Sequence, residues 1–184
     1  MGCLGTLIQF ILLSWALTFV WNKLLVPLFG KGGEGAARPR PGSASAREGR
    51  TRYLRLLMPL LAKIAKADGR VSESEISGVE AIFRELGLSA EERRFAAQVF
   101  SRSKDSPEQF DEAAIAFARE VGNFELRVIT FQYLVRVACA DGELSPRERE
   151  MALRAARCFG IPDFLVARIF AAVAGDFQGW GRTA

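Results

Sequence analysis

One stretch of about ten residues occurs twice in this chain. KADGRVSESE begins at Lys66 and CADGELSPRE begins at Cys139, and the residues that they share are 73 positions apart. The shared positions are Asp68/Asp141, Gly69/Gly142, Ser72/Ser145 and Glu75/Glu148, and the same offset joins the apolar pairs Leu61/Leu134, Ile64/Val137 and Leu88/Ile161. A match of this length is an internal repeat, so the chain is expected to fold as two related halves.

Apolar residues around both copies recur with the period of an α-helix. Seven stripes of this kind follow one another: Leu54/Leu57/Met58/Leu61/Ile64, Ile76/Val79/Ile82/Phe83/Leu86, Val99/Phe100, Phe110/Ala114/Phe117/Val121, Leu126/Ile129/Tyr133/Val137, Ala152/Ala155/Phe159 and Phe164/Ile169/Phe170/Val173. No segment alternates polar and apolar residues over the length of a strand. The sequence therefore predicts an all-α domain of about seven helices, made of two pseudo-repeated halves packed on each other.

The starts of several helices are marked by capping boxes, in which a Ser and a Glu or Gln three residues later bond to each other's backbone N–H. The pattern fits Ser72-x-x-Glu75, Ser89-x-x-Glu92, Ser106-Pro107-x-Gln109 and Ser145-Pro146-x-Glu148. Pro59 lies inside the first stripe, and it predicts either a kink in that helix or a start of the helix after Arg50.

The first part of the chain has a different character. The 19 residues from Cys3 to Trp21 carry no formal charge, which approaches the roughly 20 residues that span a bilayer. No cation precedes this segment and no cleavage site follows it, so an uncleaved anchor is favoured over a signal peptide. Ser14 and Thr18 are small residues four apart and would allow two such helices to form a homodimer. We therefore expect a transmembrane anchor and interfacial segment over residues 1–29.

Basic residues follow this apolar segment and none precedes it. Cations remain on the cytoplasmic side of a span, so the sequence predicts a single-pass protein of the inner (cytoplasmic) membrane with its N-terminus outside. Residues 30–50 consist of Gly, Ala, Ser, Pro and charged residues and are predicted to form a flexible linker. The helical domain is then expected over residues 51–174 and a C-terminal tail over 175–184.

Charge and composition exclude several classes of function. Up to Arg52 there are seven Lys or Arg and two Glu, whereas the remainder holds 18 basic and 19 acidic residues. The net charge of +4 thus belongs to the N-terminal part, and nucleic-acid binding by the domain is not expected. The chain contains no histidine, which removes His-dependent catalysis and His-ligated zinc. Three cysteines without metal-ligand spacing indicate reduced, mostly buried thiols in a cytosolic domain.

The repeated carboxylates have two interpretations. As capping residues, Glu75 and Glu148 would bond back to the start of their helices, and Asp68 and Asp141 would serve the turn. If the two halves face each other, the four carboxylates would instead converge on a hard divalent cation. The sequence excludes a true EF-hand, because no carboxylate stands at the first or third position of the loop. Capping boxes form without any ligand, so capping is the primary interpretation and no cofactor is required.

The two ADG…S…E junctions in an all-α domain of this length resemble the TerB-like (tellurite resistance) domain family, most specifically in ACADGELSPREREM from Ala138 to Met151. With its single N-terminal span and short linker, the chain also resembles the membrane-anchored N-terminal part of the DjlA family of co-chaperones, over residues 1 to about 174. The resemblance implies a role in stress response or assembly at a membrane. It also implies that the acidic positions proposed to chelate metal correspond to Asp68, Glu75, Asp141 and Glu148.

The resemblance stops at the J domain, with which DjlA proteins stimulate an Hsp70 partner through a His-Pro-Asp tripeptide. Without histidine no such stimulation is expected. The leading hypothesis is a non-enzymatic interaction module, tethered to the bilayer and bound to an unidentified protein partner. The alternative is a metal-binding stress sensor that uses the four carboxylates. An enzyme is the third hypothesis, and no nucleophile–base pair, P-loop or dinucleotide fingerprint supports it.

Overall fold

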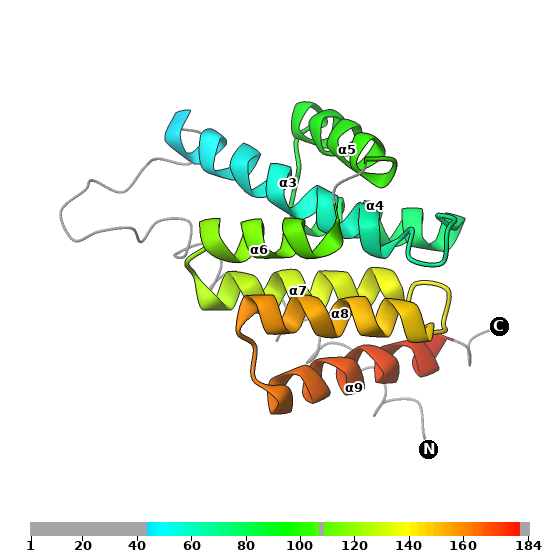
Figure 1. Ribbon diagram of the computed structural model, residues 1–184. Helices are drawn as coiled ribbons and strands as arrows, with labels where there is room; N and C mark the ends of the chain where they lie inside the picture. The colour runs from blue at the N-terminus through cyan, green and yellow to red at the C-terminus, as the bar shows by residue number, and fades with distance from the viewer. Residues whose placement is uncertain (1–43, 107–108, 181–184) are drawn as a thin grey trace, which may run out of the picture. The chain divides into compact units, whose positions relative to one another are not determined.

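The computed structural model describes residues 44–106 and 109–180, and within these ranges it contains seven α-helices and no strand. The helices are α3 (Ala44–Ile64), α4 (Glu73–Glu85), α5 (Ala90–Lys104), α6 (Phe110–Glu120), α7 (Phe124–Ala138), α8 (Pro146–Phe159) and α9 (Asp163–Trp180) (Figure 1). The predicted all-α class and the seven helices are confirmed for this part of the chain. The predicted membrane anchor and most of the predicted linker lie outside the described residues.

None of the helices in the described ranges is both long enough and apolar enough to cross a bilayer.

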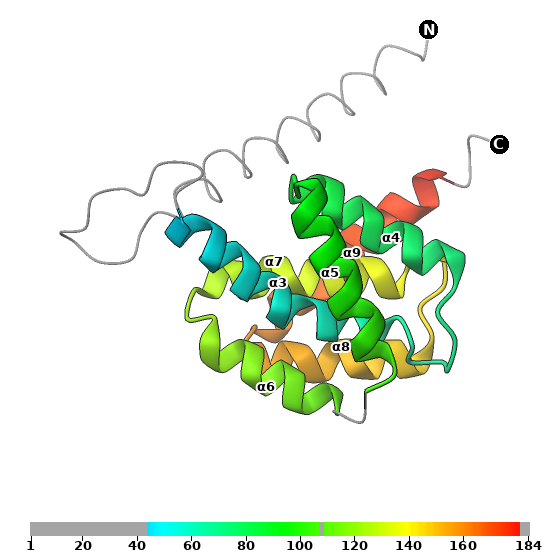
Figure 2. The same cartoon turned by 90° about the horizontal axis from the view of Figure 1, so that it is seen from above.

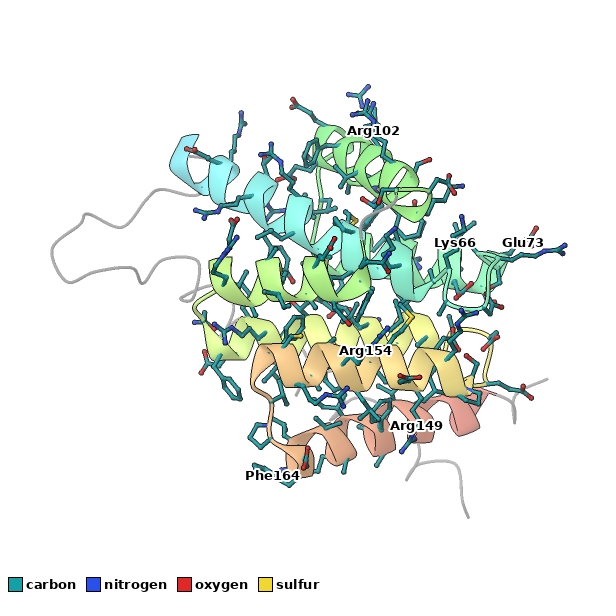
Figure 3. All side chains as sticks on the ribbon, in the orientation of Figure 1. Lys66, Glu73, Arg102, Arg149, Arg154 and Phe164 are labelled. Carbon is teal, nitrogen blue, oxygen red and sulfur yellow. The ribbon has the colours of Figure 1, made fainter. Side chains whose placement is uncertain are left out.

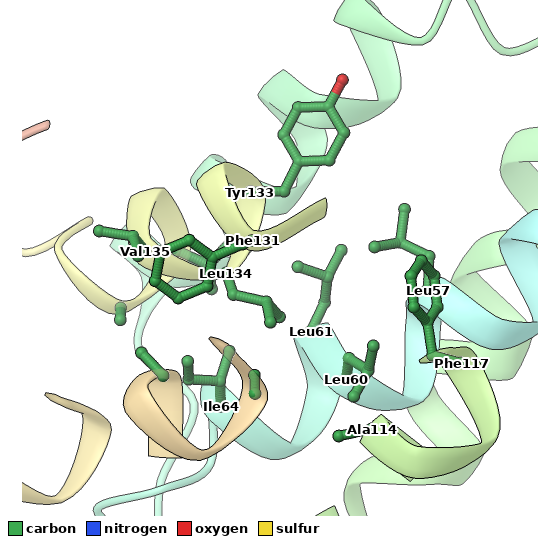
Figure 4. Packing of buried hydrophobic residues seen from close by; sticks show 14 of the residues in the cluster. Leu57, Leu60, Leu61, Ile64, Ala114, Phe117, Phe131, Tyr133, Leu134 and Val135 are labelled. Atoms are coloured by element: carbon green, nitrogen blue, oxygen red, sulfur yellow. The ribbon is translucent and has the colours of Figure 1, made fainter. Parts of the chain in front are cut away.

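A compact unit begins at Arg52, and α3 supplies the middle of its core. Leu57, Leu61 and Ile64 of this helix are completely buried, and Figure 4 shows them among aromatic side chains of other helices. Phe117 of α6 has its ring centroid 5.0 Å from that of Phe159 of α8. The first stripe of apolar residues was therefore assigned correctly to the core.

Pro59 is accommodated inside α3, which begins at Ala44. The alternative that the helix begins only after Arg50 was wrong. The residues before Arg50 include Ala44, Ala46 and Arg47, which have high helix propensity.

The helices of the compact unit differ in how deeply they are buried. Figure 1 draws α6, α7, α8 and α9 as successive rows; α8 packs against both α6 and α7, and α7 also packs against α4 and α9. Seven residues of α7 are buried, whereas α5 buries only Ala96 and Ser103 among the residues described. The core therefore lies between α3, α4, α6, α7, α8 and the inner face of α9, and α5 is peripheral.

Arg127 of α7 ties the ends of two other helices together. Its guanidinium donates to the carbonyl oxygens of Val121 (2.6 Å) and Ala118 (2.7 Å) at the end of α6, and to that of Phe159 (3.3 Å) at the end of α8. The last carbonyls of a helix have no partner within that helix, and a cation is favourable at this negative end of the helix dipole. One side chain therefore caps two helices and fixes them to a third.

Three predictions about single positions were wrong. Ile76 and Phe164 were assigned to apolar stripes, but they are 49% and 66% exposed. The predicted capping box at Ser106 does not start α6, which begins at Phe110 with Gln109 as its N-cap. Periodicity identifies the helix on which a residue lies, but whether a neighbour covers that residue depends on tertiary packing.

Candidate functional site: two matched helix junctions

The first junction joins α3 to α4 through the residues of the first ADG motif. Ser72 is the N-cap of α4, and its Oγ accepts from the Glu75 N–H at 3.1 Å. Glu75 Oε2 in turn accepts from the Ser72 N–H at 2.6 Å, which completes a capping box. Gly69 has φ 101°, a backbone conformation that residues other than glycine rarely adopt. Glu75 is buried, with 5% of its surface exposed.

The second junction, between α7 and α8, repeats this arrangement atom for atom. Ser145 Oγ accepts from the Glu148 N–H at 3.2 Å, and Glu148 Oε2 accepts from the Ser145 N–H at 2.9 Å. Gly142 has φ 91°, and Glu148 is 6% exposed. The predicted capping boxes at both copies are confirmed, so the repeat in the sequence encodes one helix junction used twice.

Asp68 and Asp141 also have the same local role in the two copies. Asp68 Oδ1 accepts from the N–H of Arg70 at 3.1 Å, and Asp141 Oδ1 accepts from that of Glu143 at 3.0 Å. A bond from an Asp carboxylate to the N–H two residues later closes an Asx turn. Both aspartates are exposed. Turn chemistry therefore accounts for their presence at matched positions, with one carboxylate oxygen engaged in each.

The two junctions lie side by side at one end of the unit, as Figures 1 and 2 show from two directions. Figure 3 labels Lys66 and Glu73 of the first junction at this end. Gly78 of α4 faces the second junction so closely that a Cβ added to it would meet the Cβ of Ala140 at 3.4 Å. The expectation that the two halves face each other is met at this end of the unit.

Burial and the neighbouring carboxylates affect the titration of Glu75 and Cys139. Burial raises the pKa of Glu75 above its ordinary value, bonds from Ser72 oppose this, and the charges of Glu148 and Asp68 raise the pKa further. Burial and the charges of Glu148 and Asp141 raise the pKa of Cys139 to about 11. The thiol beside the second junction is therefore protonated at neutral pH and is neither a nucleophile nor a soft metal ligand in that state.

The junctions differ at one aligned position. Lys66 in the first copy donates to Asp105 Oδ1 at 2.7 Å and so links the junction to the end of α5. The equivalent residue in the second copy is Cys139, which is buried. The letters KADG and CADG show this difference, but the partner of Lys66 is 39 positions away and no local pattern indicates it.

The fit of the four carboxylates to a cation can be judged from their bonds. Each of them uses one oxygen to accept a backbone N–H of its own junction. Within residues 44–106 and 109–180 no group of three or more acidic, thiol or imidazole side chains has the arrangement of a metal centre. The cation site therefore stays a prediction, and it would use the second oxygens of the four carboxylates.

Comparison with known proteins bears on the same region. The model of the family described as tellurite resistance protein TerB matches residues 55–170, which include both junctions. Among curated proteins, the co-chaperone protein DjlA of Vibrio parahaemolyticus is 27% identical over 133 residues, which are 72% of this chain and 43% of that protein. DjlA of Yersinia pestis is 30% identical over 110 residues, which are 59% of this chain and 40% of that protein.

DjlA of Photobacterium profundum is 29% identical over 136 residues, which are 73% of this chain and 47% of that protein. The chain thus spans less than half the length of these curated relatives. No solved structure is similar enough to count as a match.

Proposed function

This chain belongs to the TerB family of tellurite resistance proteins, and from that premise we propose that it is a non-enzymatic interaction module tethered to the cytoplasmic face of the inner membrane. The similarity to the co-chaperone DjlA, which extends over 133 residues of this chain, is the observation that supports the proposal. In this proposal the chain acts in stress response or in assembly at the membrane, and it does so through a protein partner.

Two features of the sequence support the tether. The uncharged segment from Cys3 to Trp21 has the length of a membrane span, and the cations that follow it favour a cytoplasmic domain. The 184 residues contain no histidine, so the proposal does not include J-type stimulation of an Hsp70 partner.

A pair of fusions tests the tether and its orientation. Alkaline phosphatase joined after Ala184 is expected to be inactive, and green fluorescent protein at the same point is expected to fluoresce and to sediment with membranes. The matched control carries the same fusions on residues 44–184 and should remain in the soluble fraction. An active phosphatase would place the domain on the other side of the membrane. Fluorescence that stays soluble with the full chain would refute the anchor.

The alternative function, a metal-binding stress sensor, is favoured by one observation. Glu75 and Glu148 are both buried, and after burial the charge of Glu148 is among the causes that raise the pKa of Glu75. A cation bound by the second oxygens of Asp68, Glu75, Asp141 and Glu148 would relieve this repulsion. Carboxylate oxygens select hard ions such as calcium or magnesium.

Calorimetry on chelator-treated residues 44–184 tests this alternative with calcium, magnesium and zinc. A cation site predicts a saturable heat that Asp68→Asn and Asp141→Asn abolish. Glu73→Gln is the control, since Glu73 is an exposed acid at the same end of the unit without a place in the cluster. Heats equal to those of dilution for all three ions would leave only the capping role of the four residues.

A further inference from the structure

The outer face of α9 differs in composition from the outer face of α8. The exposed residues on its described part are Asp163, Phe164, Ala167, Arg168, Ala171 and Ala172. On α8, by contrast, the exposed residues are Pro146, Arg147, Arg149, Glu150 and Arg157. An apolar line through Phe164, Ala167 and Ala171 thus lies on the outer face of α9. Phe164, at 66%, is the most exposed of the large hydrophobic residues in the described part of the chain; the other exposed ones are Ile76, Ile115 and Phe124.

The inner face of α9 is already used for packing. Val166, Ile169 and Val173 are buried, and the ring of Phe170 meets that of Phe131 edge-on at 5.9 Å. Figure 3 shows Phe164 at the start of α9, directed away from the other helices. The exposure of Phe164 is therefore not caused by loose packing of the helix, because the opposite face is well buried.

Cations flank this apolar line on both sides. At 100° per residue, Arg168 lies on one side of the line and Phe170 on the other. The guanidinium of Arg149 is 5.2 Å from the centroid of the Phe170 ring, which places a second cation on that side. Asp163 is the one acid among the exposed residues described on α9, and it lies at the first position of the helix, on the side of Phe170. An apolar centre with cations at both margins is the pattern of helices that lie in the interface of an anionic bilayer.

We propose that the outer face of α9 docks on the anionic inner surface of the membrane, with Phe164 in the interface and Arg149 and Arg168 at the lipid phosphates. The inference rests on the proposed tether. If residues 30–43 form the flexible linker that their composition predicts, they span on the order of 20 Å, so the bilayer is present at high effective concentration. Docking would orient both helix junctions relative to the membrane.

Charge argues for lipid rather than for a second copy of the chain as the occupant of this face. In a two-fold symmetric pair of α9 helices each margin of the face meets a margin of its partner. Both margins carry an arginine, so a pairing of unlike margins would bring Arg149 near Arg168, and only Asp163 would offset Arg149 in a pairing of like margins. A surface of lipid phosphates neutralises both margins at once.

Fluorine NMR on the full chain in vesicles with a minority of phosphatidylglycerol tests the proposal. Trifluoromethyl-phenylalanine is placed at one position at a time. Position 164 reports docking, position 115 is the control, and position 10 reports the anchor. Ile115 is 56% exposed on α6, so its exposure matches that of Phe164. A nitroxide lipid broadens probes that touch the bilayer, and a gadolinium chelate in the water broadens those that do not.

Docking predicts that the signal at position 164 is broadened by the nitroxide lipid and protected from the gadolinium chelate. The signal at position 115 should be broadened by the gadolinium chelate and not by the nitroxide lipid. Arg168→Gln should lower the ratio of docked to free domain about fivefold, the effect of roughly 1 kcal/mol for one cation at an anionic surface. Vesicles of neutral phosphatidylcholine alone should lower the ratio as well.

Two results would overturn the proposal, and they differ from failure of the anchor. Equal broadening of positions 164 and 115 by the gadolinium chelate would show that the face is free. Protection of position 164 from the chelate without broadening by the lipid would show that a protein covers it. If instead the signal at position 10 is untouched by the nitroxide lipid, the tether itself is refuted, whatever the signal at position 164 does.

Discussion

Arg127 is expected to contribute more to the stability of the domain than any capping box. Two of its bonds are short, at 2.6 Å to Val121 and 2.7 Å to Ala118, and the third, to Phe159, is 3.3 Å. A hydrogen bond from a charged donor contributes about 1.5–3 kcal/mol. Arg127 is only partly buried, so water can replace part of each hydrogen bond, and we take the lower value of this range for each of the two short bonds. Arg127→Met should therefore lower the free energy of unfolding by about 3 kcal/mol.

The variants are measured by urea unfolding of residues 44–184, followed by circular dichroism. The buried apolar residues of the described part of the chain run from Tyr53 to Val173, so this fragment, which contains them, is expected to unfold cooperatively. The loss corresponds to a fall in melting temperature of roughly 10 °C for a domain of this size. Arg127→Lys keeps the charge but has one side-chain nitrogen in place of three. We expect its free energy of unfolding to fall by about half as much as that of Arg127→Met.

Arg119→Met is the matched control, because Arg119 is an exposed arginine at the end of α6. It should change the free energy of unfolding by less than about 0.5 kcal/mol. An Arg127→Met variant as stable as this control would refute the reasoning that one guanidinium holds the ends of α6 and α8. A change in the slope of the urea transition would instead indicate an altered unfolded state.

Two further predictions concern the junctions. Gly69→Ala and Gly142→Ala should each lower the free energy of unfolding by about 1–3 kcal/mol, because alanine is strained at φ values of 101° and 91°. The control is Gly122→Ala in the same urea titration. Gly122 has equal space for a Cβ and no positive φ, so this variant should be nearly neutral. Burial and then the charges of Glu148 and Asp68 hold the pKa of Glu75 above its ordinary 4.5, so ionised Glu75 destabilises the fold as the pH rises through the folded-state value. The stability of Glu75→Gln relative to wild type should therefore increase as the pH is raised above 4.5. Glu92→Gln, which alters another capping box, should not show this trend. Parallel pH profiles for Glu75→Gln and wild type would contradict the raised pKa of Glu75.

The sequence by itself determined the local structure of this domain. Helix period, capping residues and the offset of 73 positions identified all seven helices, the starts of α4 and α8, and the likeness of the two junctions. These features depend on bonds within a few residues, such as that between Ser72 and Glu75, so the letters themselves specify them. The family followed from the same residues, because the junction motif is its most specific segment.

Tertiary structure decided which side chains meet and which stay exposed. Arg127 reaches Phe159 across 32 positions, and Lys66 reaches Asp105 across 39, distances over which no sequence period operates. Phe164 and Ile169 belong to one apolar stripe, yet Ile169 is buried and Phe164 is not. Burial depends on whether another helix covers a position, and among the described residues α9 is buried on its inner face, through Val166, Ile169 and Val173. The exposed face of α9 could therefore be recognised only once the helices had been placed in space.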